Sequence, residues 1–337
     1  MGNYTSLSDL QTKTYHDAIL ALQGHHQAVD NLAPYSGWMY FKKVGAREYL
    51  FHAIDRRNNG KSMGARSPET EAKLAQWLSA KAEAEAAFER ATQALEQQKR
   101  FCKAARLGRL HKTAAKLLRL LDKAGVSDRF IVLGTHALYA YEAMAGVHFS
   151  TDLTATMDFD ILWDSRLKMT FATDDESVGG LMGMLKKVDK TFTRNTERTF
   201  QAINADGFAV EILRPNEPRE PALIAPGDQI APIHLAGMEF LLGAGILAET
   251  VIAEDGYPLL MRVPDPAAYV LHKLWVSERP DRRKDKAGRD VKQAMALASL
   301  IRERIPFYGF EVDRIQGFAP ELLEYLDRVL TQPATNS

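Results

Sequence analysis

Two aspartates that stand one residue apart, Asp158 and Asp160, could bind a divalent cation. They lie in the run MDFDILW, whose other positions are apolar. In a β-strand, residues i and i+2 point to the same side, so the two carboxylates would share one face and could hold one cation between them. The other interpretation is a pair of solvent-facing acids on an edge strand.

A third acid, Glu211, stands between apolar neighbours in FAVEIL, which also has the pattern of a strand. A site with two metal ions needs a third carboxylate to bridge its cations. Glu211 could instead form an ion pair with Arg194, Arg198 or Lys187.

The turn Gly134-Thr135 ends the apolar run FIVL and precedes a helical segment. Unpaired backbone N–H groups at such a helix start attract phosphate. The alternative is that Thr135 only caps a helix. His136 and His148 are expected to be packing or surface residues, because no second His or Cys has zinc-ligand spacing.

Basic residues near the C-terminal end could bind a triphosphate. Lys273 lies on an expected helix, and its alternative role is a lysine with a packed stem and its charge in water. Asp290 could cap a helix or pair with Lys273. Arg283, Lys284 and Arg289 belong to a basic loop that faces either substrate or solvent.

The surrounding pattern predicts helices and short strands. Before the acids we expect helices and one hairpin, with Ser67-Pro68 as a helix start. Expected helices cover residues 1–34, 67–107, 111–124, 236–247, 265–278, 290–304 and 319–330. Expected strands and hairpins cover residues 37–55, 130–133, 158–163, 191–195, 199–204, 208–213, 250–253 and 259–263.

The net charge of zero conceals an asymmetry between the two parts of the chain. Residues 1–133 contain 21 Lys and Arg against 13 Asp and Glu, and residues 134–337 contain 22 against 30. Basic patches at 42–66 and 99–123 could bind the phosphates of nucleic acid, or could be solvated faces. No apolar run is long enough to span a bilayer, so no membrane partner is expected. The single cysteine, Cys102, favours a reducing cytoplasm.

The motifs LGTHALYAYEAMAG, TATMDFDILWD and FAVEIL resemble those of the DNA polymerase beta-type nucleotidyltransferase superfamily. More narrowly, GWMYFKKVGAREYLF, SMGARSPETEA, VPDPAAYVLHKLW and RDVKQA make nearly the whole chain similar to a bacterial family of nucleotidyltransferases related to the abortive-infection toxins. The resemblance implies that Gly134 and Thr135 bind nucleotide phosphates. It also implies that Asp158, Asp160 and Glu211 bind Mg²⁺, and that Lys273 and Asp290 match later toxin motifs. Thr135 departs from the usual Gly or Ser, and Glu211 from the Asp of many members.

We therefore expect an α/β (α+β) fold with a minimal nucleotidyltransferase core and a mixed sheet. The expected regions are a helical and hairpin region at 1–126, the core at 127–214 and a mainly helical region at 215–337. The expected activity is transfer of an NMP from an NTP to RNA, tRNA, protein or a small molecule, with two Mg²⁺ ions, or Mn²⁺ in their place. The basic N-terminal half would hold an RNA or tRNA acceptor, and the activity could be toxin-like. The alternative is a non-catalytic nucleic-acid-binding module. The oligomeric state does not follow from the sequence.

Overall fold

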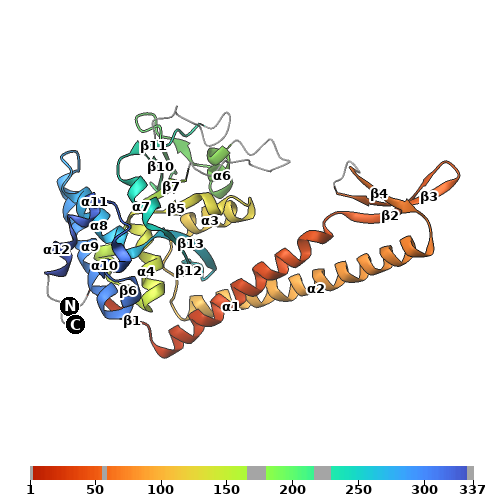
Figure 1. Ribbon diagram of the computed structural model, residues 1–337, viewed down its shortest axis with the longest axis horizontal. Helices are drawn as coiled ribbons and strands as arrows, with labels where there is room; N and C mark the ends of the chain where they lie inside the picture. The colour runs from red at the N-terminus through yellow and green to blue at the C-terminus, as the bar shows by residue number, and fades with distance from the viewer. Residues whose placement is uncertain (1–2, 55–58, 165–179, 216–228, 332–337) are drawn as a thin grey trace. The chain divides into compact units, whose positions relative to one another are not determined.

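The computed structural model describes residues 3–54, 59–164, 180–215 and 229–331 (Figure 1). The chain forms two compact units. We call Lys13–Arg106 the hairpin unit, and Met1–Thr12 with Leu107–Ser337 the main unit. Within the described residues, no helix is both long enough and apolar enough to cross a membrane.

Two long helices and a three-stranded antiparallel sheet make up the hairpin unit. Its elements are α1 (Asp9–Leu32, which begins in the main unit), the short η1 (Ala33–Tyr35), β2 (Trp38–Val44), β3 (Arg47–Ala53), β4 (Gly60–Ala65) and α2 (Pro68–Ala104). As the sequence predicts, Ser67 caps α2, because its hydroxyl accepts a hydrogen bond from the Thr70 amide while the Thr70 hydroxyl accepts one from the Ser67 amide. The expected hairpin is confirmed, and β4 adds a third strand to it.

The main unit is organised around a mixed sheet with the strand order β5-β7-β10-β9-β8, to which β11 adds by pairing with β10. Strands β7 and β10 are parallel neighbours at its centre, and β5 and β9 pair with them antiparallel. The six strands are β5 (Phe130–Val132), β7 (Asp158–Trp163), β8 (Thr193–Arg194), β9 (Gln201–Ile203), β10 (Ala209–Pro215) and β11 (Ile233–Leu235). The α+β fold with a mixed sheet is thus confirmed.

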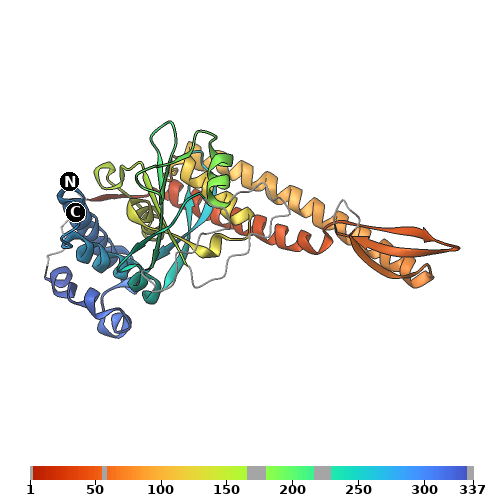
Figure 2. The ribbon, with the colours of Figure 1, turned by 90° about the horizontal axis from the view of Figure 1, so that it is seen from above.

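Helices and two small sheets pack around this sheet (Figure 2). The small sheets pair β1 (Tyr4–Ser6) with β6 (Val147–Phe149), and β12 (Ile246–Ile252) with β13 (Pro258–Pro264). The helices are α3 (Lys112–Lys123), η2 (Ser127–Arg129), η3 (Gly134–Ala137), α4 (Leu138–Ala145), α5 (Thr151–Thr154), α6 (Gly180–Val188), α7 (Met238–Ala244), α8 (Pro266–Ser277), α9 (Lys284–Arg304), η4 (Pro306–Tyr308), α10 (Val312–Ile315), α11 (Pro320–Leu323) and α12 (Leu326–Leu330). One continuous apolar core includes Phe159 and Ile161 of β7, Val210 of β10, and Leu271 of α8.

Several expected helices differ in the structure. The helix expected over residues 1–34 begins only at Asp9, because Tyr4–Ser6 pair with β6 as strand β1. Helix α9 begins at Lys284 rather than at Asp290, because Asp285 falls in its first turn, where an acid is favourable. The helix expected over 236–247 ends at Ala244, since the chain turns at Gly245 with a φ of 107° and enters β12. The last expected helix is divided into α11 and α12. Residues 216–228 of the expected connector lie outside the described residues.

Candidate active site

The three acids lie on one face of the central sheet. Strands β7 and β10 run parallel, with Asp160 directly opposite Glu211 and Asp158 opposite Ala209. Cross-strand partners share a face, as do residues i and i+2, so all three carboxylates emerge on the same side. The opposite side buries Phe159, which is fully inaccessible to solvent, in the core. The core therefore fixes which way the acids face.

Asp160 is packed against the backbone of Gly134. A Cβ atom on Gly134 would lie 1.9 Å from Asp160 Oδ2, and Gly134 has a φ of 58°, which disfavours any other residue. The pKa of Asp160 is raised to about 7, first by burial and then by the Glu211 and Asp158 carboxylates, while Lys286 and Lys273 oppose the rise. The site thus holds more negative charge than its cations compensate.

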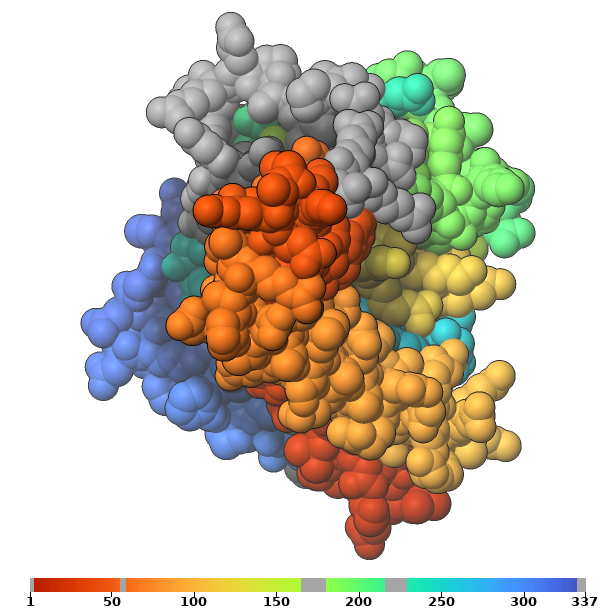
Figure 3. Space-filling model, turned by 90° about the vertical axis from the view of Figure 1, so that its right-hand side faces the viewer, coloured from red at the N-terminus to blue at the C-terminus, as the bar shows by residue number. Residues whose placement is uncertain are grey.

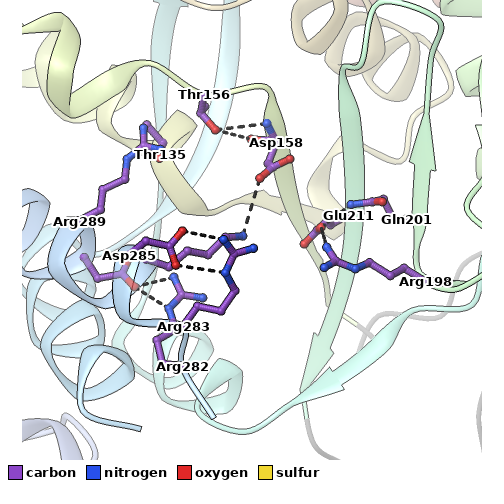
Figure 4. A network of polar contacts seen from close by, with 12 residues as sticks. Thr135, Thr156, Asp158, Arg198, Gln201, Glu211, Arg282, Arg283, Asp285 and Arg289 are labelled. Carbon is purple, nitrogen blue, oxygen red and sulfur yellow. Dashed lines mark hydrogen bonds and ion pairs between the residues drawn. The ribbon is translucent and has the colours of Figure 1, made fainter. Parts of the chain in front are cut away.

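The other two carboxylates make protein contacts (Figure 4). Asp158, whose side chain is 45% exposed, lies 3.8 Å from Lys286 Nζ of α9. Glu211, whose side chain is 14% exposed, accepts a 2.6 Å hydrogen bond from Gln201 Nε2. The ion pair considered for Glu211 is observed with Arg198, at 3.8 Å.

These donors suit a hard divalent cation chemically. Across the described ranges, no group of three His, Cys, Asp or Glu is already arranged to hold a metal ion. Asp158 and Glu211 are, however, on the same face as Asp160, and oxygen donors are those that Mg²⁺ prefers. After burial, the charges of Glu211 and Asp158 are the next causes that raise the pKa of Asp160, and a cation would offset both the burial and this repulsion. The residues fit a Mg²⁺ site once the side chains of Asp158 and Glu211 turn toward Asp160.

The Gly134-Thr135 turn starts η3 directly beside Asp160. Thr135 is buried, and its hydroxyl accepts a 3.1 Å hydrogen bond from Gln293 Nε2 of α9. Its side chain makes no helix cap, so that interpretation was wrong. The Tyr269 hydroxyl donates to the Gly134 carbonyl oxygen, which ties the turn to α8. The next residue, His136, is a buried packing residue as expected, and burial lowers its pKa to about 3.

Lys273 and Asp290 form a buried ion pair between α8 and α9. Lys273 Nζ donates to Asp290 Oδ1 at 2.7 Å, and Arg282 contacts Asp290 Oδ2 at 2.5 Å. Burial lowers the pKa of Lys273, although Asp290 raises it. Of the two roles considered for Asp290, ion partner is confirmed and helix cap is wrong, since it lies inside α9. The ammonium group of Lys273 does not stand in water.

A cleft with a volume of about 260 Å³ brings most of these groups together, although Asp158 and Thr135 are not among the residues that line it. The sheet side contributes Gly134, Asp160 and Glu211, and the helical side contributes Lys273, Arg282 and Lys286. Further apolar side chains line one part of it, among them Leu213, Leu235, Met238, Leu241 and Val276. The cleft therefore has an acidic wall, an apolar part and a basic wall, on which cationic side chains outnumber the carboxylates of Asp281 and Asp290.

The basic wall differs from the one expected. Arg283 pairs with Asp285 in solvent, Lys284 is exposed, and Arg289 donates to the Ala155 carbonyl oxygen. Arg282 and Lys286 line the cleft instead, and neither is among the residues expected from the sequence. Lys286 precedes Asp290 by four residues, so the two lie on the same face of α9. A helix expected from Lys284 onward would therefore have indicated Lys286 as a site residue.

Comparison with protein families gives one match. The model of a family described as nucleotidyltransferase matches residues 112–311, which is more than half of the chain. Comparisons with curated proteins and with solved structures gave no match. The matched range contains Gly134, the three acids and the Lys273–Asp290 pair. The chain belongs to this nucleotidyltransferase family.

Proposed function

We propose that the protein transfers a nucleoside monophosphate from an NTP to an acceptor hydroxyl, with Mg²⁺ or Mn²⁺ and with release of pyrophosphate. One observation carries this proposal: Asp160 and Glu211 face each other across β7 and β10 in a cleft whose other wall is basic. Nucleotidyl transfer needs carboxylates that bind a metal cation and cationic side chains that bind the phosphates.

Asp158, Asp160 and Glu211 are the proposed ligands of two cations. Bound there, the cations would supply charge neutralisation for the triphosphate and lower the pKa of an attacking hydroxyl. Glu211 is our candidate for receiving the proton of that hydroxyl. Gln201 orients its carboxylate through the 2.6 Å hydrogen bond.

The basic wall and the Gly134-Thr135 turn are the proposed phosphate contacts. Lys273, Arg282 and Lys286 would hold the β- and γ-phosphates by charge, and Asp290 keeps Lys273 and Arg282 in place. Such groups act mostly by positioning and by electrostatic stabilisation of the transition state.

From the motifs LGTHALYAYEAMAG, TATMDFDILWD and FAVEIL, we infer that the protein is related to enzymes of the DNA polymerase beta type and to bacterial abortive-infection toxins. A cytoplasmic location agrees with the use of NTP. If the protein is a toxin, its expression arrests growth, and Asp160→Ala abolishes the arrest.

The proposed acceptor is RNA or tRNA, held by the basic N-terminal half. Its charge also supports the second candidate, a non-catalytic nucleic-acid-binding module. Steeply salt-dependent nucleic-acid binding without any metal-dependent use of NTP would favour that module.

Labelling with each α-³²P NTP, Mg²⁺ and separate RNA, protein and metabolite fractions tests the proposal. The wild type labels one fraction, and Asp160→Asn lowers the rate roughly a thousandfold, because a metal ligand contributes several kcal/mol to the transition state. The matched control is Asp152→Asn, which changes an exposed aspartate of α5 and keeps the wild-type rate. Equal rates for both variants would refute the assignment of the metal ligands.

A further inference from the structure

The sheet of the hairpin unit has one covered face and one open face. Helix α2 covers the face that carries buried Met39 and Leu50. There, the His52 ring lies 5.6 Å from the Trp77 ring of α2, and the guanidinium of Arg66 lies 4.8 Å from the Phe41 ring. The strand register assigns the alternate residues of β2 and β3 to the opposite face.

The open face combines aromatic rings with cations. Its cross-strand pairs are Tyr40 with Phe51, Lys42 with Tyr49, and Trp38 with Ala53. Trp38 is 36% exposed and Val44 is 50% exposed, and Lys42 and Arg47 are also exposed. The rings of Tyr40, Tyr49 and Phe51 are half-buried, and Ala53, at one end of this face, is buried. The end of the sheet reaches the molecular surface in Figure 3, in orange.

The charged side chains on the open face are all cationic. Lys42 and Arg47 lie on it, whereas Glu48 lies on the covered face, where it pairs with Arg66. Among the described residues of β2, β3 and β4, no carboxylate lies on the open face. Lys42 Nζ lies 5.6 Å from the centre of the Phe51 ring, so a cation and a stacking surface stand side by side.

We propose that this open face binds single-stranded RNA. Unpaired bases would stack on the rings of Trp38, Tyr40 and Phe51, and phosphates would contact Lys42 and Arg47. Aromatic rings on a sheet next to cations are the combination that single-stranded nucleic acids need, and a duplex cannot present its bases in this way. The hydroxyls of Tyr40 and Tyr49 would form hydrogen bonds with the 2′-OH groups of RNA.

This inference names the acceptor class and its docking surface, and it rests on the proposed function in that respect. A merely structural role is the alternative, since aromatic cross-strand pairs also stabilise sheets. The test must therefore separate RNA binding from folding and from catalysis.

The chain offers a matched pair of variants, Lys42→Ala and Lys43→Ala. The two lysines are adjacent and both exposed, but only Lys42 is on the open face. Binding of the full-length protein to a fluorescein-labelled 12-nucleotide RNA is measured by anisotropy in EDTA without NTP, so that no transfer occurs. We expect Lys42→Ala to weaken binding about fivefold and to lower the salt slope by about 0.7, the value for one phosphate contact. Lys43→Ala should stay within about twofold of the wild type.

Tyr40→Leu tests the stacking component. It keeps an apolar side chain, and we expect roughly tenfold weaker binding, as for the loss of one stacked base. Trp fluorescence should be quenched by the RNA in the wild type and not in Trp38→Phe. Circular dichroism spectra matching the wild type establish that each variant is folded.

Equal effects of Lys42→Ala and Lys43→Ala would overturn the proposal, as would equal binding of a duplex. Equal or tighter binding of a DNA oligomer of the same sequence would overturn the assignment to RNA. The variant Asp158→Ala with Asp160→Ala separates the two proposals, because it should lose NTP-dependent labelling and keep RNA binding. Labelling without RNA binding refutes only the docking surface, and RNA binding without labelling refutes only the transferase.

Discussion

Gly134 sets the position of Asp160. Because a Cβ atom at this residue would lie 1.9 Å from Asp160 Oδ2, Gly134→Ala must displace the carboxylate or the turn. We expect the NTP-labelling rate to fall at least about a hundredfold, as a ligand misplaced by about 1 Å costs that much. The free energy of unfolding should also fall by about 1–2 kcal/mol, the cost of a left-handed backbone.

The control for this variant is Gly125→Ala. Gly125 has a similar φ of 66°, but a Cβ atom there would meet nothing within 4 Å. It carries the same backbone cost without contact to the site, so its stability should fall and its labelling rate should not. A full rate in Gly134→Ala would show that Asp160 does not need this packing.

At the residue scale, the sequence revealed the acids but not their partners. The alternation of MDFDILW predicts that Asp158 and Asp160 share a face, and the register confirms it. Nothing in the sequence indicates that Gln293 contacts Thr135 from 158 residues away, or that Gln201 contacts Glu211. Such contacts depend on tertiary packing, which one sequence does not display.

At the element scale, the helices α8 and α9 are joined by the buried pair Lys273–Asp290. Asp290→Asn would leave the buried ammonium of Lys273 without its charge partner. We expect the free energy of unfolding, measured by urea denaturation, to fall by about 3–5 kcal/mol. Combining it with Lys273→Met should restore part of that loss, because no unpaired ammonium then remains.

Asp285→Asn is the control on the same helix. Its side chain is 63% exposed and pairs with exposed Arg283, so its removal should change stability by less than about 1 kcal/mol. Equal losses for Asp285→Asn and Asp290→Asn would contradict the view that this pair connects the helices.

His272 on α8 should make the stability pH-dependent. Burial lowers its pKa to about 3, and the charge of Lys273 contributes to the lowering. The unfolded chain binds this proton near pH 6.5 and the folded chain only near pH 3, so stability is present above pH 6.5 and is lost as the pH falls. Between pH 7 and 5, we expect the wild type to lose roughly 2 kcal/mol more than His272→Gln.

Urea denaturation at both pH values measures this difference. His16→Gln, which replaces an exposed histidine of α1, should lose as much stability as the wild type. The same loss in His272→Gln would show that His272 does not account for the acid sensitivity.

The boundaries of elements were harder to predict than their type. Asp265-Pro266 predicts the start of α8, and Asp265 Oδ1 accepts hydrogen bonds from the amides of Ala267 and Ala268. The charged run RPDRRKDK has the composition of a solvated loop and so predicts a start at Asp290, whereas α9 begins six residues earlier, at Lys284. The Lys and Asp side chains of this run suit an exposed helix turn as well as a loop. The choice between helix and loop depends on the packing of Asp290 and Gln293, which are buried in α9.

At the scale of the whole molecule, the excess of basic residues lies in the N-terminal part of the chain, which includes the hairpin unit proposed to bind RNA. The main unit carries the acids and the cleft, and the hairpin unit carries the open aromatic and basic face. The three-region division proposed from the sequence places its first boundary at residue 126, whereas the compact units meet at residue 106. Helix α3 belongs to the main unit because its apolar face, including Leu117 and Leu121, lies in that core.

The position of the transferred phosphorus tests the central claim most directly. Parallel reactions contain Mg²⁺, cellular RNA and the same NTP labelled either at the α- or at the γ-phosphate. We predict that α-label enters the acceptor and that γ-label appears only in pyrophosphate. EDTA should abolish both, and Asp160→Asn should lower both roughly a thousandfold. Transfer of γ-label to the acceptor, or α-label transfer at the wild-type rate in Asp160→Asn, would contradict a nucleotidyl transfer that depends on these acids.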